Sequence, residues 1–259
     1  MIKQAIIPLA GLGTRLLPLT SVFAKELLPI DGKPGIEYIL DECIEAGIKD
    51  IIFVISKKKE IIKKYFYNDK FYKSLIKKKN DPRLIKEYKK ILFYKKKIKF
   101  VYQNKPLGTG DAVFKAKKFI KDKYFLLLLP DDLIIKKNCS KEMIKVHKKY
   151  EAAVMASLKV KRNNVDRWGI YSISKTLDKS NFKISDVIEK PDSNNAPSTN
   201  AVIGRYILNK DIFKYLKNQK KGKGGEIHIT DAIRKMISKN NLFIGHKFSG
   251  KYLDCGTMR

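Results

Sequence analysis

The chain has 259 residues, of which 44% are hydrophobic, which is enough to bury the core of one large domain. Its longest apolar run, YFLLLLP, is far too short to cross a bilayer, and the first residues lack the apolar core and cleavage site of a signal peptide. We therefore expect a cytoplasmic protein with no membrane partner. Cys43, Cys139 and Cys255 are widely spaced without a CxxC pair, which argues against a disulfide framework and against a zinc site.

The formal net charge of +30 raises the question of nucleic-acid binding. Lysine greatly outnumbers arginine, and the lysine runs, such as KKKEIIKKY and YKKKIKF, are spread along the chain. An AT-rich coding sequence that drifts toward lysine, isoleucine and asparagine codons on a solvated surface produces the same profile. We favour this drift and expect no specific nucleic-acid partner. A basic nucleic-acid-binding protein is the non-enzyme alternative.

Strand and helix signals alternate through the first 150 residues. QAIIPLA predicts a buried strand, the apolar spacing of GKPGIEYILDECIEAG predicts a helix, and DIIFVIS predicts a second strand parallel to the first. The predicted elements that follow are a basic helical segment at 57–97, a strand at IKFVYQ, a helix at GDAVFKAKKFI and a buried strand at YFLLLLPDD. This order predicts an α/β fold with a doubly wound, mostly parallel sheet.

Beyond about residue 150 the pattern changes to strands with few helices between them. The predicted strands are AAVMASLKV, WGIYSIS, FKISDVIEKP and AVIGRYIL, and a late helix is predicted at ITDAIRKMISK. No flexible linker separates the two parts. We therefore predict one domain over residues 1–259, with a nucleotide-binding core at 1–150 and a strand-rich addition at 151–259.

The loop AGLGTRLLPLTSVFAKELLP leaves the carboxyl end of the first predicted strand. The backbone N–H groups of Leu12, Gly13 and Thr14 can approach an anion there, Arg15 supplies a planar cationic fork, and Lys25 supplies a flexible point charge. The loop fits neither GxGxxG nor a Walker loop. A triphosphate suits the arrangement, while an ordinary turn with an exposed arginine is the alternative for a lone GxG.

The whole stretch, with GxGTR followed by LP, Thr20 and KELLP, resembles the signature of the sugar-1-phosphate nucleotidylyltransferases. The form AGLGTR…AKELLP is similar to the bacterial branch that joins UTP and glucose 1-phosphate, whereas thymidylyltransferases and mannose guanylyltransferases more often begin with a Gly-Gly pair. The resemblance runs from residue 4 to Gly256. It implies a Rossmann-like core, catalytic roles for Arg15 and Lys25, and a nucleotide-binding role for four loop residues, Ala10, Gly11, Gly13 and Thr14.

The segment YQNKPLGTGDAV resembles the base-recognition segment of this family, in which Gln103 and Gly108 contact the uracil. A glutamine amide offers a donor and an acceptor together, as a pyrimidine edge requires, and a glycine lets the ring lie against the backbone. Taken alone, Gln103 would be a surface polar residue.

Two adjacent carboxylates, Asp131 and Asp132, follow the buried strand in LLLLPDD, at the strand end where α/β folds bind ligands. In extended chain they point to opposite sides, so only one of them is expected to bind an ion. The resemblance makes it Asp131, holding Mg²⁺ against the phosphates, with Asp254 of YLDCG as a second ligand. A solvated Asp-Asp turn is the alternative.

The resemblance assigns sugar binding to residues 151–259. In VIEKP, Glu189 would accept hydrogen bonds from glucose hydroxyls and Lys190 would bind the sugar phosphate. The other residues assigned to the sugar pocket are Gly169, Gly204 and Glu226. Glu226 alone could be ordinary helix-terminus polarity. Cys255 has no histidine nearby in sequence, and a packed thiol is favoured over a nucleophile.

The function that the resemblance implies is uridylyl transfer from UTP to glucose 1-phosphate, giving UDP-glucose and pyrophosphate with Mg²⁺ as cofactor. Transfer to the same sugar from dTTP is the enzymatic alternative. The family normally continues past the segment matching DCGT into helices that contribute to subunit contacts, whereas this sequence stops at Arg259. We expect a homo-oligomer whose assembly is weakened by the short carboxyl end.

Overall fold

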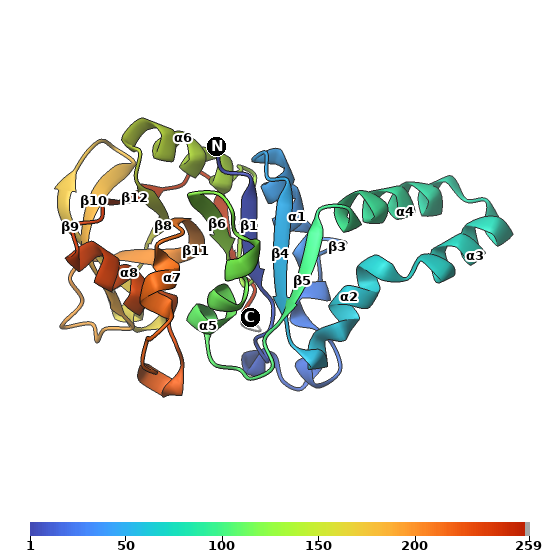
Figure 1. Cartoon of the computed structure of the whole chain (residues 1–259), viewed down its shortest axis with the longest axis horizontal. Coiled ribbons are helices and arrows are strands. Elements are labelled where there is room, and N and C mark those ends of the chain that lie inside the picture. The colour runs from blue at the N-terminus through green and yellow to red at the C-terminus, as the bar shows by residue number, and fades with distance from the viewer. Residues whose placement is uncertain (257–259) are drawn as a thin grey trace.

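A mixed sheet runs through the whole molecule in the computed structural model, which describes residues 1–256. In this part of the chain the sheet has nine strands in the order β5-β4-β1-β6-β11-β8-β12-β10-β9 (Figure 1). The strands are β1 (Gln4–Pro8), β4 (Asp50–Ile55), β5 (Ile98–Tyr102), β6 (Tyr124–Leu128), β8 (Ala153–Lys159), β9 (Gly169–Thr176), β10 (Asn181–Glu189), β11 (Asn200–Asn209) and β12 (Phe243–Lys247).

The first half of the sheet is parallel, with β1 between β4 and β6 and with β5 beside β4. The helix α1 (Gly35–Glu45) connects β1 to β4, so the predicted strand–helix–strand unit is confirmed. Alternate residues of these strands feed two cores on opposite faces, as Ile6 and Ile7 of β1 do. Because both faces are covered, the inner strands β1, β4 and β6 are mostly apolar, whereas the edge strand β5 carries the exposed Lys99.

The second half of the sheet is mainly antiparallel, and the prediction of a mostly parallel sheet is wrong for the sheet as a whole. In the described part, five of the nine strand pairings are antiparallel. The connection from β9 to β10 is only a short turn, and short turns impose antiparallel pairing because a parallel pair needs a long crossover. An added pairing of β11 with β9 closes β11, β8, β12, β10 and β9 into a small barrel.

Helices cover both faces of the sheet (Figure 1). The apolar sides of α1 and α6 (Cys139–Tyr150) belong to one core, and those of α5 (Thr109–Lys115), α7 (Ile212–Leu216) and α8 (Ile229–Ser238) belong to the other. The sequence pattern predicted α5 and α8 but not α6 or α7.

The basic segment 57–97 is helical, as predicted; it forms three helices, which project beyond the β5 edge of the sheet (Figure 1). They are α2 (Glu60–Tyr67), α3 (Asp69–Lys79) and α4 (Pro82–Lys95). At the start of α4 the side chain of Asp81 accepts the N–H of Arg83, and Pro82 occupies the first helical position, as expected at a helix start. No residue of α3 is buried. None of the helices within residues 1–256 combines the length and apolar character needed to cross a membrane.

Two small ribbons complete the described structure, and the sequence analysis predicted neither. The strands β2 (Pro29–Ile30) and β3 (Lys33–Pro34) form a hairpin before α1. The strand β7 (Asp132–Ile135) pairs antiparallel with β13 (Lys251–Asp254), which sets Asp254 opposite Asp132. This second ribbon brings the end of the described chain next to the end of β6.

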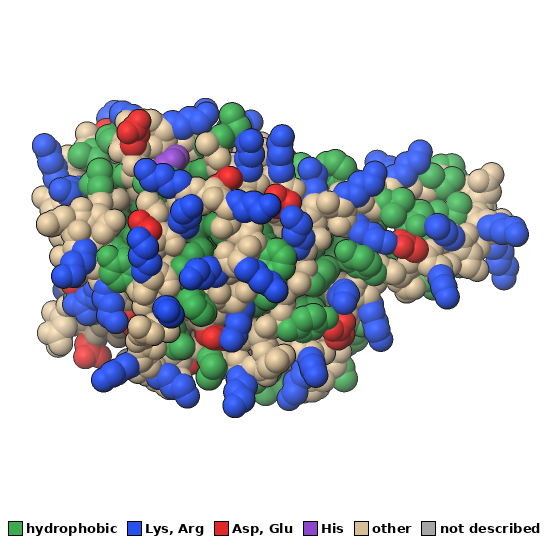
Figure 2. All heavy atoms as spheres, viewed as in Figure 1, with side chains coloured by type: hydrophobic (Ala, Val, Ile, Leu, Met, Phe, Trp, Pro, Cys, Tyr) green, Lys and Arg blue, Asp and Glu red, His purple; other side chains and the backbone are tan. Residues whose placement is uncertain are grey.

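On the face shown in Figure 2, the lysines and arginines are dispersed rather than gathered in one stripe. They lie over the sheet domain and the projecting helices alike, with hydrophobic and acidic side chains between them. This distribution agrees with the expectation of a generally solvated basic surface.

Candidate active site

A cavity of about 440 Å³ lies where the parallel strands end. Ala10 follows β1, Gln103 follows β5 and Asp131 follows β6, and all three line it, as expected for ligand binding at the carboxyl edge of an α/β sheet. The opposite wall comes from the barrel, through Gly169 and Glu189. Of the fifteen site residues that the sequence predicted, all except Lys190 and Gly204 line this cavity.

The glycine loop presents bare backbone to the cavity. Gly13 has φ 71°, and a Cβ placed there would lie 3.0 Å from Cγ2 of Thr20, so this position requires glycine. The hydroxyl of Thr20 donates to the carbonyl oxygen of Gly13 at 2.9 Å and holds the turn. Within residues 1–256, the N–H groups of Leu12, Gly13 and Thr14 donate to no other backbone carbonyl. With the exposed Arg15 beside them, they can receive an anion.

The adjacent carboxylates Asp131 and Asp132 have different partners. Nζ of Lys25 lies 2.5 Å from the carboxylate of Asp131, at the cavity wall. The carboxylate of Asp132 accepts the hydroxyl of Tyr252 at 2.6 Å and the backbone N–H of Gly204 at 2.8 Å. Burial raises the pKa of Asp132 above its ordinary value. Asp131 therefore forms an ion pair with the flexible side chain of Lys25, whereas Asp132 is held by hydrogen bonds within the fold.

Asp254 approaches Asp131 from the far end of the chain. Its carboxylate pairs with Nη2 of Arg167 at 2.8 Å and accepts the N–H of Gly256 at 2.9 Å. A Cβ placed on Gly256 would lie 3.2 Å from Oδ1 of Asp254 and 3.4 Å from Oδ2 of Asp131, so the two carboxylates flank the same point. Cys255 connects them, because its N–H donates to the carbonyl oxygen of Asp131 at 2.7 Å.

This pair of carboxylates fits a magnesium ion. Mg²⁺ prefers oxygen ligands and typically takes one or two carboxylates together with water and substrate phosphates. Within the described part of the chain, no three His, Cys, Asp or Glu side chains gather into a fuller ligand set. A metal held by Asp131 and Asp254 would leave its remaining coordination positions to water and substrate phosphates.

The amide of Gln103 is buried at the cavity wall, with 4% of the residue exposed. Its Nε2 donates to the carbonyl oxygen of Gly108 at 3.1 Å and to Oδ2 of Asp111 at 2.8 Å. Both N–H bonds of the amide are thus used inside the protein. Contrary to the expectation that this side chain offers a donor and an acceptor together, it offers only the acceptor Oε1.

Three of the predicted sugar residues line the cavity, namely Gly169, Glu189 and Glu226, and Glu226 lies against Gly108, where an added Cβ would come within 2.9 Å of Cβ of Glu226. Oε2 of Glu189 accepts the hydroxyl of Thr230 at 3.0 Å. Gly169 is next to it, since a Cβ placed there would lie 3.3 Å from the same oxygen. Lys190 directly follows Glu189, and its N–H donates to the carbonyl oxygen of Trp168 at 3.0 Å, but it does not itself line the cavity.

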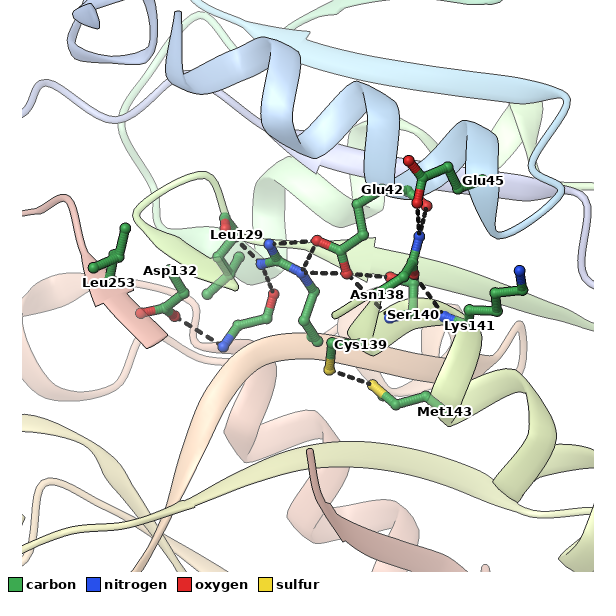
Figure 3. Close-up of polar contacts among 12 residues, drawn as sticks. Glu42, Glu45, Leu129, Asp132, Asn138, Cys139, Ser140, Lys141, Met143 and Leu253 are labelled. Atoms are coloured by element: carbon green, nitrogen blue, oxygen red, sulfur yellow. Dashed lines mark hydrogen bonds and ion pairs between the residues drawn. The ribbon is translucent and has the colours of Figure 1, made fainter. Parts of the chain in front are cut away.

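Gly204 is not among the residues that line the cavity, although its neighbours Leu129 and Asp132 are. A Cβ there would lie 2.5 Å from Cβ of Leu129 and 2.6 Å from Oδ2 of Asp132. The missing side chain lets β11 approach the turn that carries Asp131. Figure 3 draws the polar contacts of this region. Asp132 and Leu129 lie to the left of Glu42 in this view, and Ser140 lies to its right.

Several cavity residues were missed by the sequence analysis. Glu26 lines the cavity and pairs with Lys59 at 2.5 Å, while Arg167, Trp168 and Tyr252 enter it from the barrel and from β13. Local patterns do not identify them, because their partners lie far away in the sequence. The position of Arg167 just before the WGIYSI strand was the available signal. Burial and the neighbouring carboxylates raise the pKa of the Cys255 thiol to about 11, which disfavours a nucleophilic thiolate.

Comparisons with known proteins agree with this geometry. The family model described as nucleotidyl transferase matches residues 4–259. A UTP–glucose-1-phosphate uridylyltransferase of Bacillus subtilis is 37% identical over 257 residues, which cover 98% of this chain and 87% of that protein. A UDP-glucose pyrophosphorylase solved in complex with UDP-glucose superimposes with a TM-score of 0.86 at 35% identity, covering 99% of this chain and 94% of the other. The UTP-bound UGPase from Acinetobacter baumannii gives 0.87 at 33% identity, covering 99% and 90%.

Proposed function

Because the chain belongs to the nucleotidyl transferase family, we propose that it transfers the uridylyl group of UTP to glucose 1-phosphate, forming UDP-glucose and pyrophosphate. The relatives support the choice of substrates, since they are named for this reaction and one was solved with UTP and another with UDP-glucose. The observation that carries the proposal is the single cavity that joins the glycine loop, the acceptor of Gln103 and the paired carboxylates Asp131 and Asp254.

The chemistry needs positioning and charge neutralisation rather than a general base. A phosphate oxygen of glucose 1-phosphate is already anionic and attacks the α-phosphorus of UTP. The bond from that phosphorus to the oxygen bridging to the β-phosphate breaks, and its electron pair leaves with pyrophosphate. Arg15 and Lys25 lie on the glycine-loop side of the cavity and stabilise the departing charge.

Asp131 and Asp254 would hold Mg²⁺ in this site, because both carboxylates lie beside Gly256 and both residues line the cavity. The bound ion would offset negative charge on the phosphate that is attacked. Lys25 forms an ion pair with the carboxylate of Asp131, which places the positive charge of Lys25 beside the phosphates. Arg167 holds Asp254 in place from the barrel side.

We further propose that residues 1–150 bind the nucleotide and residues 151–259 bind the sugar. Gly13, Gln103 and Asp131 come from the first part, whereas Gly169 and Glu189 come from the second, and both groups line the same cavity. Glu189, held by Thr230, would accept hydrogen bonds from the glucose hydroxyls.

Replacing Lys190 with alanine is expected to raise the KM for glucose 1-phosphate by about tenfold to a hundredfold, since a charge-assisted hydrogen bond to phosphate is lost. The KM for UTP should stay near the wild-type value. Lys183→Ala is the matched control, because Lys183 is an exposed lysine on β10, the strand that Lys190 directly follows, and does not line the cavity. Steady-state kinetics with each substrate varied separately give the two constants. Equal increases for both substrates would count against a sugar-phosphate role.

The proposed reaction is tested by pyrophosphate release over a matrix of UTP, dTTP, CTP and ATP with several sugar 1-phosphates. We expect UTP with glucose 1-phosphate to give the highest kcat/KM. Uracil and thymine differ by one methyl group, so the base is expected to contribute only about 1–3 kcal/mol to the preference for UTP over dTTP. A clear preference for dTTP would assign thymidylyl transfer instead. No turnover together with tight binding of a defined nucleic-acid sequence would favour the non-enzyme alternative.

A further inference from the structure

We infer that Asp111 is a positioning residue for base selection: by fixing the amide of Gln103, it makes the cavity accept bases with an N3–H group and reject cytosine. The inference rests on the proposed function, since it assumes a pyrimidine nucleotide at Gln103. Asp111 lies in the first turn of α5 and is 8% exposed, and its carboxylate oxygen accepts Nε2 of Gln103 at 2.8 Å.

The partners of the amide determine which end faces the cavity. The carbonyl oxygen of Gly108 and the carboxylate of Asp111 are both acceptors and cannot donate. The NH₂ group of Gln103 must therefore face them, because the reversed amide would put oxygen against oxygen. Within residues 1–256, no hydrogen bond is formed to Oε1 of Gln103, which leaves this oxygen as the acceptor at the cavity wall.

An acceptor at this place distinguishes the pyrimidine bases by chemistry rather than by size. Uracil and thymine carry a hydrogen on N3 and can donate it to Oε1. Cytosine has an unprotonated N3, which is itself an acceptor, so the same approach would bring two lone pairs together. A buried site that leaves such groups unpaired rejects the wrong ligand far more strongly than a site that only misses a methyl contact.

Asp111→Asn removes one of the two constraints on the amide. An asparagine amide can accept from Gln103 or donate to it, so the reversed orientation of Gln103 is opposed only by the carbonyl of Gly108. We expect the ratio of kcat/KM for UTP to that for CTP to fall at least about tenfold. The ratio for UTP to dTTP should stay unchanged, because uracil and thymine present the same N3–H.

The matched control is Lys115→Gln. Nζ of Lys115 lies 3.7 Å from Asp111, one turn along α5, so this variant changes the charge beside Asp111 and keeps the Asp111–Gln103 hydrogen bond. Both ratios should keep their wild-type values in this control. Asp111→Ala is made in parallel, and thermal unfolding shows which of the two Asp111 variants keeps the wild-type transition. In a variant that does, we expect the same fall in the ratio of kcat/KM for UTP to that for CTP.

Turnover and calorimetric binding of UTP, dTTP and CTP are measured for the wild type and each variant. A wild type that binds UTP and not CTP, with a variant that binds both, supports the inference even where turnover is slow. Asp111 variants that lose UTP, dTTP and CTP binding in equal proportion would overturn it, since a merely structural role lowers all three together. A wild type that transfers no uridylyl group would instead refute the proposed function.

Discussion

Replacing Asp131 with asparagine is expected to lower kcat by about a hundredfold or more while the protein stays folded. The amide keeps the volume of the side chain but removes the negative charge that Mg²⁺ requires, and a catalytic metal supplies several kcal/mol of charge stabilisation in the transition state. The folded state should lose little, because the side chain of Asp131 is 40% exposed and its ion pair with Lys25 is screened by solvent.

Pyrophosphate release at saturating substrates and at a series of Mg²⁺ concentrations measures this effect, and thermal unfolding checks the fold. Asp254→Asn is compared directly, since it removes the second carboxylate that flanks the same point. An exposed aspartate outside the cavity, Asp192, provides the control Asp192→Asn, which should behave as the wild type. Near-normal turnover of Asp131→Asn with a strong loss in Asp254→Asn would transfer the main metal role to Asp254.

The parts of the site that local sequence patterns encode were predictable. A glycine loop must follow a buried strand to present its N–H groups, and both features are contiguous in residues 4–25. The same holds for Asp131, which follows the apolar run of β6 directly. The parallel half of the sheet was predictable for a related reason, because a strand, a helix and a strand in sequence leave few alternative arrangements.

The parts that depend on long-range pairing were not predictable in this way. The ribbon of β7 and β13 brings Asp254 beside Asp131, although more than a hundred residues separate them. The sequence also suggested that Gln103 presents a free donor, because the nearby carboxylate of Asp111 could not be placed without the structure. The prediction of a mostly parallel sheet was wrong because local patterns do not determine which strand edge each later strand joins. After residue 150, the order and direction of the strands depend on that long-range choice.

Arg205 interrupts the apolar strand AVIGRYIL, and a charged residue in a buried strand needs a buried partner. The structure supplies Glu42 of α1, a residue 163 positions away in the sequence, and the side chain of Arg205 is fully buried. This pair is the basis of the second large effect that we expect.

Arg205→Met is expected to lower the free energy of unfolding by about 3–5 kcal/mol, because it leaves the carboxylate of Glu42 buried without its cation. In the wild type, Nε and Nη2 of Arg205 donate to Glu42 at 2.9–3.1 Å. Nη1 also donates to the carbonyl oxygens of Leu129 and Gly204, at 3.1 and 3.0 Å. The substitution removes these bonds as well, next to the turn that carries Asp131.

Urea denaturation of Arg205→Met, Glu42→Met and the double variant measures the coupling between the two charges. The double variant should be more stable than the sum of the two single losses predicts, since neither charge is then buried alone. The recovery should be partial, because Glu42 also accepts the N–H and the hydroxyl of Ser140 at the start of α6, at 3.1 and 2.6 Å. Strictly additive losses would mean that the two charges contribute independently, and the arginine would then act through Leu129 and Gly204 alone.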